Sequence, residues 1–326
     1  MELINQSALP ALLFVSELSG GRRIGTVVAK ATVRSVGHSA DVALDTQSPL
    51  PIFEVDTDSD LGVLPCDVAA RFDPGVDVLL HGAAYPHDTT GIADVTLTVA
   101  DITQRMMVFG DRFVDPGGRP EDASEPLPFK RMPLTWAHAL GGRADVWIDS
   151  KTVVPTRHFA NPHGKGFDVG EAARHLRSGL GVAEGFPRFE TRRQLPNLTH
   201  PDDPLGLSTP VCWAASPPDV LIPPTSSTST PRLSRAYPYW RDLALTFPLD
   251  IALTGCEPGG GRWDARLPRI DIAVDYVRGS RTGSLELWPS TLLLLPEERA
   301  VAITYVRSFQ FTADPSDERS LRLVVT

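Results

Sequence analysis

The stretch "LLLLPEERAVAITYV", from Leu292 to Val306, decides the fold that we expect for this chain. Two apolar runs, rich in aliphatic and β-branched residues, are separated by the polar segment Pro296–Arg299. Short apolar runs bounded by turn formers are typical of buried strands, and proline commonly opens a turn. We therefore predict two strands that are joined by a short polar loop, with no helix between them.

The same strand signals recur along the chain. Apolar and polar side chains alternate through Arg269–Val277, which predicts a half-buried strand. Other runs are rich in aliphatic and β-branched residues and are bounded by turn formers. They predict strands at Ile24–Val36, Val76–Gly82 and Val95–Val99, and an edge strand at Leu321–Thr326.

Helices are expected to be few and short. Met132–Gly142 and Asp168–Gly181 carry apolar residues at helical spacing and end in glycine. The 30 prolines and 26 glycines predict many long loops. We therefore expect a mainly β fold (α+β with few short helices), with antiparallel sheets in sandwich- or barrel-like packing.

One shift in composition predicts a domain boundary. Residues 216–232, "SPPDVLIPPTSSTSTPR", contain five prolines and a Ser/Thr cluster, which is typical of a linker or an exposed loop. Residues 1–215 are then an N-terminal β-rich domain. Residues 233–326 form either a C-terminal β domain or an extension of its sheets.

Charge and cysteine usage exclude several classes of protein. The net charge of −9 argues against partners that are nucleic acids or anionic lipids. The first residues show no secretory signal, and no apolar run is long enough to span a membrane. The three cysteines form no CxxC pair, so a structural zinc site has little support. We expect a cytoplasmic protein.

The segment "MVFGDRFV", Met107–Val114, places charged residues between two apolar runs. Gly110-Asp111 has the Gly-X form of a type II′ turn, so we predict a hairpin bend here. Catalysis by Asp111 and Arg112 would need partners, and the spacing of the chain identifies none. If Asp111 is partly buried, we expect it to pair with Arg131 or another arginine.

No motif predicts a cofactor, a metal or a catalytic group. "NPHGKGF", Asn161–Phe167, lacks the first glycine and the hydroxyl of a phosphate-binding loop, so Lys165 is predicted to be a surface lysine. His158 and His163 are the one weak candidate pair for a metal. In "RAYPYWRD", three aromatic residues are candidate interface anchors, although core packing explains them equally well: Tyr237, Tyr239 and Trp240.

Several stretches together resemble a bacterial family, domain of unknown function 2169, that occurs in type VI secretion loci. They come in the order "ELINQS", "TVVAKATV", "VDVLLHGAAY", "MMVFGDRFV", "PFKRMPLTWAHALGG", "NPHGKGF" and "LPNLTHPDDPL". The matched motif positions are Gly110, Asp111, Arg112, Arg131, Met132, Pro133, Gly141, Gly142, Asn161, Pro162, Gly164, Gly166, Phe167, Pro196 and Asn197. Turn formers and charged or aromatic anchors dominate this set, which favours structural or partner-binding roles.

The resemblance implies an adaptor or chaperone and not an enzyme. Such a protein binds a cognate secreted effector and aids its loading onto the VgrG spike. Two alternatives stay open. One is a metal-dependent hydrolase that uses His158 and His163, and the other is a structural component of the secretion apparatus.

Overall fold

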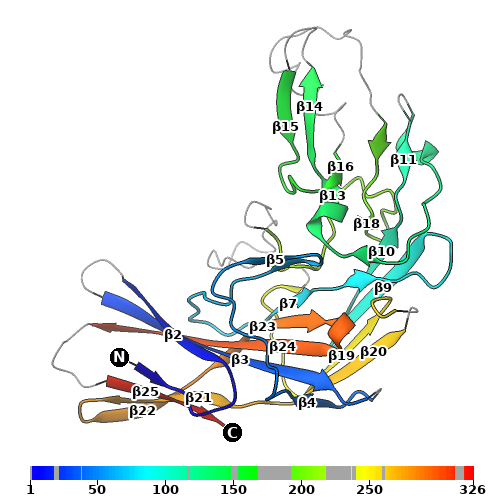
Figure 1. Cartoon of the computed structure of the whole chain (residues 1–326). Coiled ribbons are helices and arrows are strands. Elements are labelled where there is room, and N and C mark those ends of the chain that lie inside the picture. The colour runs from blue at the N-terminus through cyan, green and yellow to red at the C-terminus, as the bar shows by residue number, and fades with distance from the viewer. Residues whose placement is uncertain are drawn as a thin grey trace.

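A computed structural model describes residues 2–17, 22–37, 39–115, 118–147, 153–167, 192–217, 236, 240–258, 261–312 and 319–326. Strands dominate these residues (Figure 1). The helical elements with described bounds are 3-10 turns of three residues each: η2 (Pro120–Asp122), η3 (Trp136–His138) and η5 (Pro296–Glu298). The predicted mainly β fold is confirmed.

The largest sheet is built around the two strands that the opening stretch predicts. Its order is β2-β3-β24-β23-β7, and β4 also pairs with β3. Between β23 and β24, Arg299 adopts a left-handed backbone conformation (φ 49°) as it closes the turn that η5 begins. The strands are β2 (Ala11–Glu17), β3 (Arg22–Ser35), β4 (Val42–Leu44), β7 (Asp77–Leu80), β23 (Trp288–Leu295) and β24 (Ala300–Thr312).

Two further sheets pack against this one. The first has the order β1-β25-β21-β22: β1 (Glu2–Ile4), β25 (Arg319–Val325), β21 (Ile272–Arg278) and β22 (Arg281–Glu286). The second has the order β18-β10-β9-β19-β20: β18 (Leu198–Thr199), β10 (Ile102–Phe109), β9 (Ile92–Val99), β19 (Leu249–Thr254) and β20 (Arg262–Leu267). The strand predicted at Leu321–Thr326 corresponds to β25, but its predicted place at the edge of a sheet is wrong. Because β25 pairs with β1 on one side and with β21 on the other, it lies inside its sheet.

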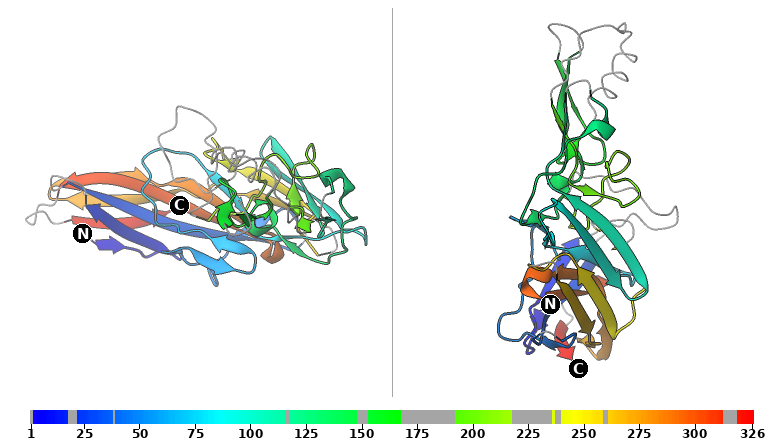
Figure 2. Two further views of the ribbon diagram at one scale, coloured as in Figure 1. Left: turned by 90° about the horizontal axis from the view of Figure 1, so that it is seen from above. Right: turned by 90° about the vertical axis from the view of Figure 1, so that its right-hand side faces the viewer.

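The remaining strands form two-stranded sheets. Near the large sheets lie β5 (Thr57–Ser59) with β6 (Gly62–Leu64), and β8 (Ala83–Ala84) with β12 (Met132–Pro133). Farther out lie β11 (Phe113–Val114) with β17 (Arg193–Gln194), β13 (Leu140–Gly141) with β16 (Lys165–Gly166), and β14 (Arg143–Trp147) with β15 (Val153–Arg157). We call residues 109–115, 136–147, 153–167 and 192–208 the arm, because they project from the large sheets (Figures 1 and 2).

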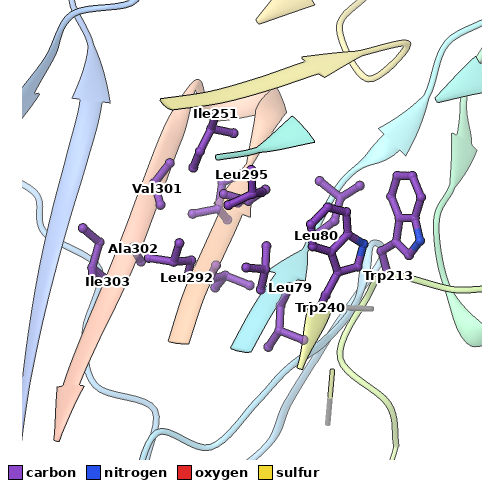
Figure 3. Packing of buried hydrophobic residues seen from close by; sticks show 14 of the residues in the cluster. Leu79, Leu80, Trp213, Trp240, Ile251, Leu292, Leu295, Val301, Ala302 and Ile303 are labelled. Atoms are coloured by element: carbon purple, nitrogen blue, oxygen red, sulfur yellow. The ribbon is translucent and has the colours of Figure 1, made fainter. Parts of the chain in front are cut away.

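One continuous core joins the three large sheets. On β3, Val27, Ala29 and Val33 face this core, whereas Thr26 and Lys30 point to the opposite face of the sheet. This alternation follows from the two-residue period of a strand. Aliphatic side chains of β7, β19, β23 and β24 fill the centre of the core, which Figure 3 shows from close by.

A pair of tryptophans closes one end of this core. Trp213 and Trp240 are fully buried, and their rings meet edge to face with centroids 6.1 Å apart. Figure 3 shows both rings beside Leu80. Of the two interpretations of Trp240, core packing is therefore correct and the surface anchor is wrong. Tyr237 and Tyr239 lie outside the described residues.

Strands from both sides of the predicted domain boundary share sheets. β19 pairs with β9, and β23 pairs in parallel with β7. The described strands after residue 240 therefore extend sheets that the first part of the chain begins. Most of the predicted linker lies outside the described residues, so the boundary itself stays a prediction.

Two local predictions are wrong. β10 pairs with β9 and β18, and β11 pairs with β17, so Gly110-Asp111 connects two different sheets and is no hairpin turn. Met132–Gly142 forms no α-helix, because its two ends join the ladders of β12 and β13 and only η3 lies between them. The predicted helix at Asp168–Gly181 falls outside the described residues.

Across the part of the chain that the structure describes, no helix combines the length and apolar character that crossing a membrane requires.

Candidate functional site

Many of the predicted motif residues meet at the base of the arm. Short pairings bring them together: β13 runs parallel to β16, and β18 pairs with the end of β10. Segments that are far apart in the sequence thus contact one another; Asn197 and Phe109, for example, are 88 residues apart and share a hydrogen bond. The site consists of these segments and the side chains that hold them.

Asn197 is the central residue of the site, and it is fully buried. Its Nδ2 donates to the carbonyl oxygen of Phe109 (2.9 Å) and to Oδ1 of Asp111 (3.0 Å). Its Oδ1 lies 3.0 Å from Nζ of Lys165 and 3.0 Å from Nδ1 of His138. Because this amide oxygen only accepts, the imidazole Nδ1 carries the proton. All the hydrogen-bonding capacity of the Asn197 amide is used.

Asp111, His138, Lys165 and Asn197 form a polar group that we call the Asn197 cluster. Nζ of Lys165 lies 3.6 Å from Oδ1 of Asp111, and both side chains are partly exposed. Burial lowers the pKa of His138, and the hydrogen bond that the imidazole donates to Asn197 opposes this effect. The Lys165 charge lowers this pKa further, and the Asp111 charge raises it. The imidazole is therefore neutral at pH 7.

Arg112 points into the protein beside this cluster. Its guanidinium donates to the carbonyl oxygens of Pro204 (2.9 Å) and Pro196 (3.1 Å) and lies 3.8 Å from the ring centroid of Phe109. Among the described residues no carboxylate pairs with it, and its Nε has no partner there. Burial lowers its pKa to about 10, which still leaves it charged at pH 7. Arg112 thus ties the segment from Pro196 to Pro204 to the end of β10.

Asn161 has a similar role beside β13. The side chain is fully buried, and its Nδ2 donates to the carbonyl oxygens of Trp136 (2.9 Å) and Leu140 (3.0 Å). Its Oδ1 accepts from the backbone of His163 (3.2 Å), and its own carbonyl accepts from the backbone of Gly142 (2.8 Å). The residue therefore fixes the loop between β15 and β16.

Two glycines of the motif are required by close backbone contacts. A Cβ on Gly110 would overlap the carbonyl group of Leu127, and Gly110 has no positive φ. A Cβ on Gly141 would overlap the carbonyl oxygen of Asn161, and here φ is also positive, at 148°. The glycines thus let backbone segments approach each other, which explains Gly110 better than the predicted turn.

The other arm residues of the motif pack around these contacts. Pro196 is buried, and its ring would meet a Cβ on Gly166 at 2.6 Å. Pro162 is buried as well, and a Cβ on Gly164 would lie 2.5 Å from Nδ2 of Asn161. The ring of Phe167 meets His158 edge to face at 5.7 Å.

The comparison with protein families decides where the chain belongs. A family model described as "Uncharacterized protein conserved in bacteria (DUF2169)" matches residues 20–241. The chain belongs to this family. No curated protein and no solved structure matches the chain.

In this DUF2169 chain, Arg131 lies away from the Asn197 cluster. Its guanidinium binds both carboxylate oxygens of Glu297 (2.9 and 3.1 Å) and Oδ2 of Asp60 (3.1 Å). The Tyr85 hydroxyl donates to the same Glu297 (2.7 Å). These bonds raise the pKa of Arg131 and lower that of Glu297. The predicted pairing of Arg131 with Asp111 is wrong, because each has other partners.

Met132 and Pro133 also lie outside the cluster. They form β12, which pairs with Ala83–Ala84. Met132 is buried against the core. These two motif positions connect the core to the arm and carry no polar chemistry.

The histidines bring no metal site together among the described residues. His158 accepts at Nδ1 from the backbone of Asn161 (3.2 Å), while His163 is exposed. In that part of the chain, no group of three or more His, Cys, Asp or Glu side chains is arranged to bind a metal ion.

His138 and Lys165 are members of the site that were not predicted from the sequence. The residues next to them in the sequence do not predict this contact, because the shared partner Asn197 lies 59 residues from His138 and 32 residues from Lys165. The position of Lys165 inside "NPHGKGF" is the one indication that the sequence offers.

Proposed function

We propose that this DUF2169 protein is a cytoplasmic adaptor that binds a secreted effector and aids its loading onto the VgrG spike of a type VI secretion system. The family match supports the resemblance on which this proposal rests. The sequences and order of the motifs add to it, because they resemble those of proteins from type VI secretion loci.

The use of the motif residues supports a binding role. Arg112, Asn161 and Asn197 are buried, and the side chain of each donates to at least one backbone carbonyl of the arm. Such bonds fix the course of the loops and leave the outer surface free to vary. A rigid frame that presents loops is a common way to build a binding surface.

Phe159 is the observation that carries the proposal. Its side chain is 76% exposed, although the residues that follow it, Ala160 and Asn161, are buried. The ring stacks on His158 with centroids 5.2 Å apart. A large aromatic side chain that a fixed loop holds outward is the type of residue that dominates binding energy in interfaces. We propose that the effector contacts the arm around Phe159.

The charge of the chain favours one class of partner. A net charge of −9 suits an effector that is basic at neutral pH. Complementary charge mainly accelerates encounter and suppresses wrong partners, so association of the two proteins should weaken as salt increases.

Co-expression with the products of the neighbouring genes tests the function. The tagged chain is purified from cells that also produce the adjacent VgrG and candidate effector, and the eluate is separated by size exclusion. We expect a complex that contains the effector. If neither VgrG nor the candidate effector is purified together with the tagged chain, the proposal is contradicted. A stable homo-oligomer without effector supports the structural alternative, and stoichiometric metal in the purified chain supports the hydrolase alternative.

A further inference from the structure

Three side chains of the Asn197 cluster are arranged as reactants. The amine of Lys165 lies 3.0 Å from Oδ1 of the Asn197 amide. Oδ1 of Asp111 lies 3.0 Å from Nδ2 of that amide and 3.6 Å from the amine. A single carboxylate oxygen therefore faces both the nitrogen that could attack the amide carbon and the nitrogen that would leave it.

We propose that Lys165 and Asn197 form an intramolecular isopeptide bond, with Asp111 as the proton relay. Asp111 takes a proton from the Lys165 ammonium, and the neutral amine attacks Cγ of Asn197. A new C–N bond forms, the bond from Cγ to Nδ2 breaks, and the departing nitrogen receives protons from the attacking amine through Asp111. One ammonium ion is released, so charge and atoms balance without any oxidant or reductant.

The surroundings add two features that favour an acyl transfer. Nδ1 of His138 donates to Oδ1 of Asn197 from 3.0 Å, so it is placed to stabilise the negative charge that develops on this oxygen. Burial keeps the imidazole neutral, so this donor does not act as a competing cation. The bond from Nδ2 to the carbonyl oxygen of Phe109 fixes the plane of the amide. Reactants held in this way avoid most of the entropic cost of meeting.

Two buried residues of the same types, Lys30 and Asn161, lack this arrangement. Lys30 contacts the carboxylate of Asp67, which also accepts from Thr304 and from the backbone of Phe53, and no amide side chain is among these partners. The Nδ2 of Asn161 is directed at two backbone carbonyl groups. Neither site offers an amine, a side-chain amide and a carboxylate in mutual contact.

The bond would join two segments of the arm permanently. Lys165 belongs to β16, and Asn197 directly precedes β18. The cross-link would therefore fix β16, and with it β13, to the large sheets through the pairing of β18 with β10. It would hold the base of the arm together when the arm carries a load.

Intact-mass spectrometry of the folded full-length chain tests the proposal. We expect a mass that is lower than the encoded mass by one ammonia molecule. Tandem spectra of a tryptic digest should show a branched peptide in which Lys165 is joined to Asn197 and is not cleaved. The encoded mass, measured on protein whose circular dichroism shows a folded β structure, overturns the proposal. A mass loss that maps elsewhere in the chain overturns it as well.

Two variants separate the roles of the residues. Lys165→Arg removes the nucleophile and keeps the charge, and Asp111→Asn removes the proton relay but keeps an acceptor for the Asn197 amide. Both should retain their encoded masses and unfold at lower denaturant concentration than the wild type. If Asp111→Asn still forms the branched peptide, the proposed relay is wrong.

Discussion

Lys30 and Asp67 form an ion pair in the interior of the protein, with 2.7 Å between Nζ and Oδ2. The two side chains are only 1% and 6% exposed. Asp67 also accepts from the hydroxyl of Thr304 (2.8 Å) and from the backbone of Phe53 (2.8 Å), and the Phe53 ring lies 4.1 Å from the ammonium group. The pair attaches the segment that precedes β7 to the polar face of β3 and β24.

Removing one partner of this pair should destabilise the fold strongly. Asp67→Ala leaves the Lys30 ammonium buried without a countercharge, and we expect a loss of about 3–5 kcal/mol in the free energy of unfolding. Burial already lowers the pKa of Lys30 against the opposing effect of Asp67. Urea unfolding of the single variant and of Lys30→Met/Asp67→Ala measures the effect. The double variant should be more stable than Asp67→Ala, and the opposite order would contradict this account.

Arg131 should stabilise the turn between β23 and β24. Arg131→Ala removes the two bonds to Glu297 and the contact with Asp60, and we expect a loss of about 1 kcal/mol because the network is partly exposed. The loss should shrink in high salt. Arg105→Ala is the matched control, since Arg105 pairs with Asp94 on an exposed strand surface. Equal effects of the two variants in a thermal melt would show that the Arg131 network has no special role.

Gly110 should tolerate no side chain, because the carbonyl group of Leu127 occupies the place of a Cβ. We expect Gly110→Ala to destabilise the protein by about 2–3 kcal/mol, since backbone must move. Gly37→Ala is the control: its φ is 65° but nothing lies within 4 Å, so about 1 kcal/mol is expected from the backbone conformation alone. Chemical denaturation compares the two. A smaller effect at Gly110 than at Gly37 would refute the explanation.

Stability should fall as the pH drops from about 7 to about 5, the range of an ordinary histidine pKa near 6.5. Burial lowers the pKa of His81 and of His138 in the folded chain. The unfolded chain therefore binds more protons in this range, so the stabilisation is complete above the unfolded pKa and is lost below it. His138→Gln should reduce the decline in the unfolding free energy between pH 7.5 and 5.5, which is about one pH unit on either side of that pKa. An unchanged pH dependence of the unfolding free energy would contradict the assignment to His138.

The strands could be predicted because their signal is local. Alternation in Arg269–Val277 and the apolar runs of Leu292–Val306 correspond to β21, β23 and β24. Which strands pair is harder to predict, because pairing depends on contacts between residues that are distant in the sequence. Thus Gly110-Asp111 has the composition of a hairpin turn, yet the strands on either side pair with β9, β18 and β17.

The candidate site could be predicted only in part for the same reason. The resemblance includes Asp111 and Asn197 among the motif residues, but nothing near them in the sequence indicates that they share contacts with Lys165 and His138. Lys30 likewise is simply one residue of a strand in the sequence, and its partner Asp67 lies 37 residues away. Exposure of Phe159 depends on the fold of the whole arm.

The most direct test of the central claim is the affinity of the cognate effector for variants of the arm, measured by isothermal titration calorimetry. Phe159→Ala should weaken binding by more than about tenfold if the ring is an interface anchor, and it should leave the unfolding free energy nearly unchanged. Phe72→Ala is the matched control, because this phenylalanine is also exposed (44%) but lies outside the arm. Wild-type affinity in Phe159→Ala, or an equal loss in Phe72→Ala, would contradict the account.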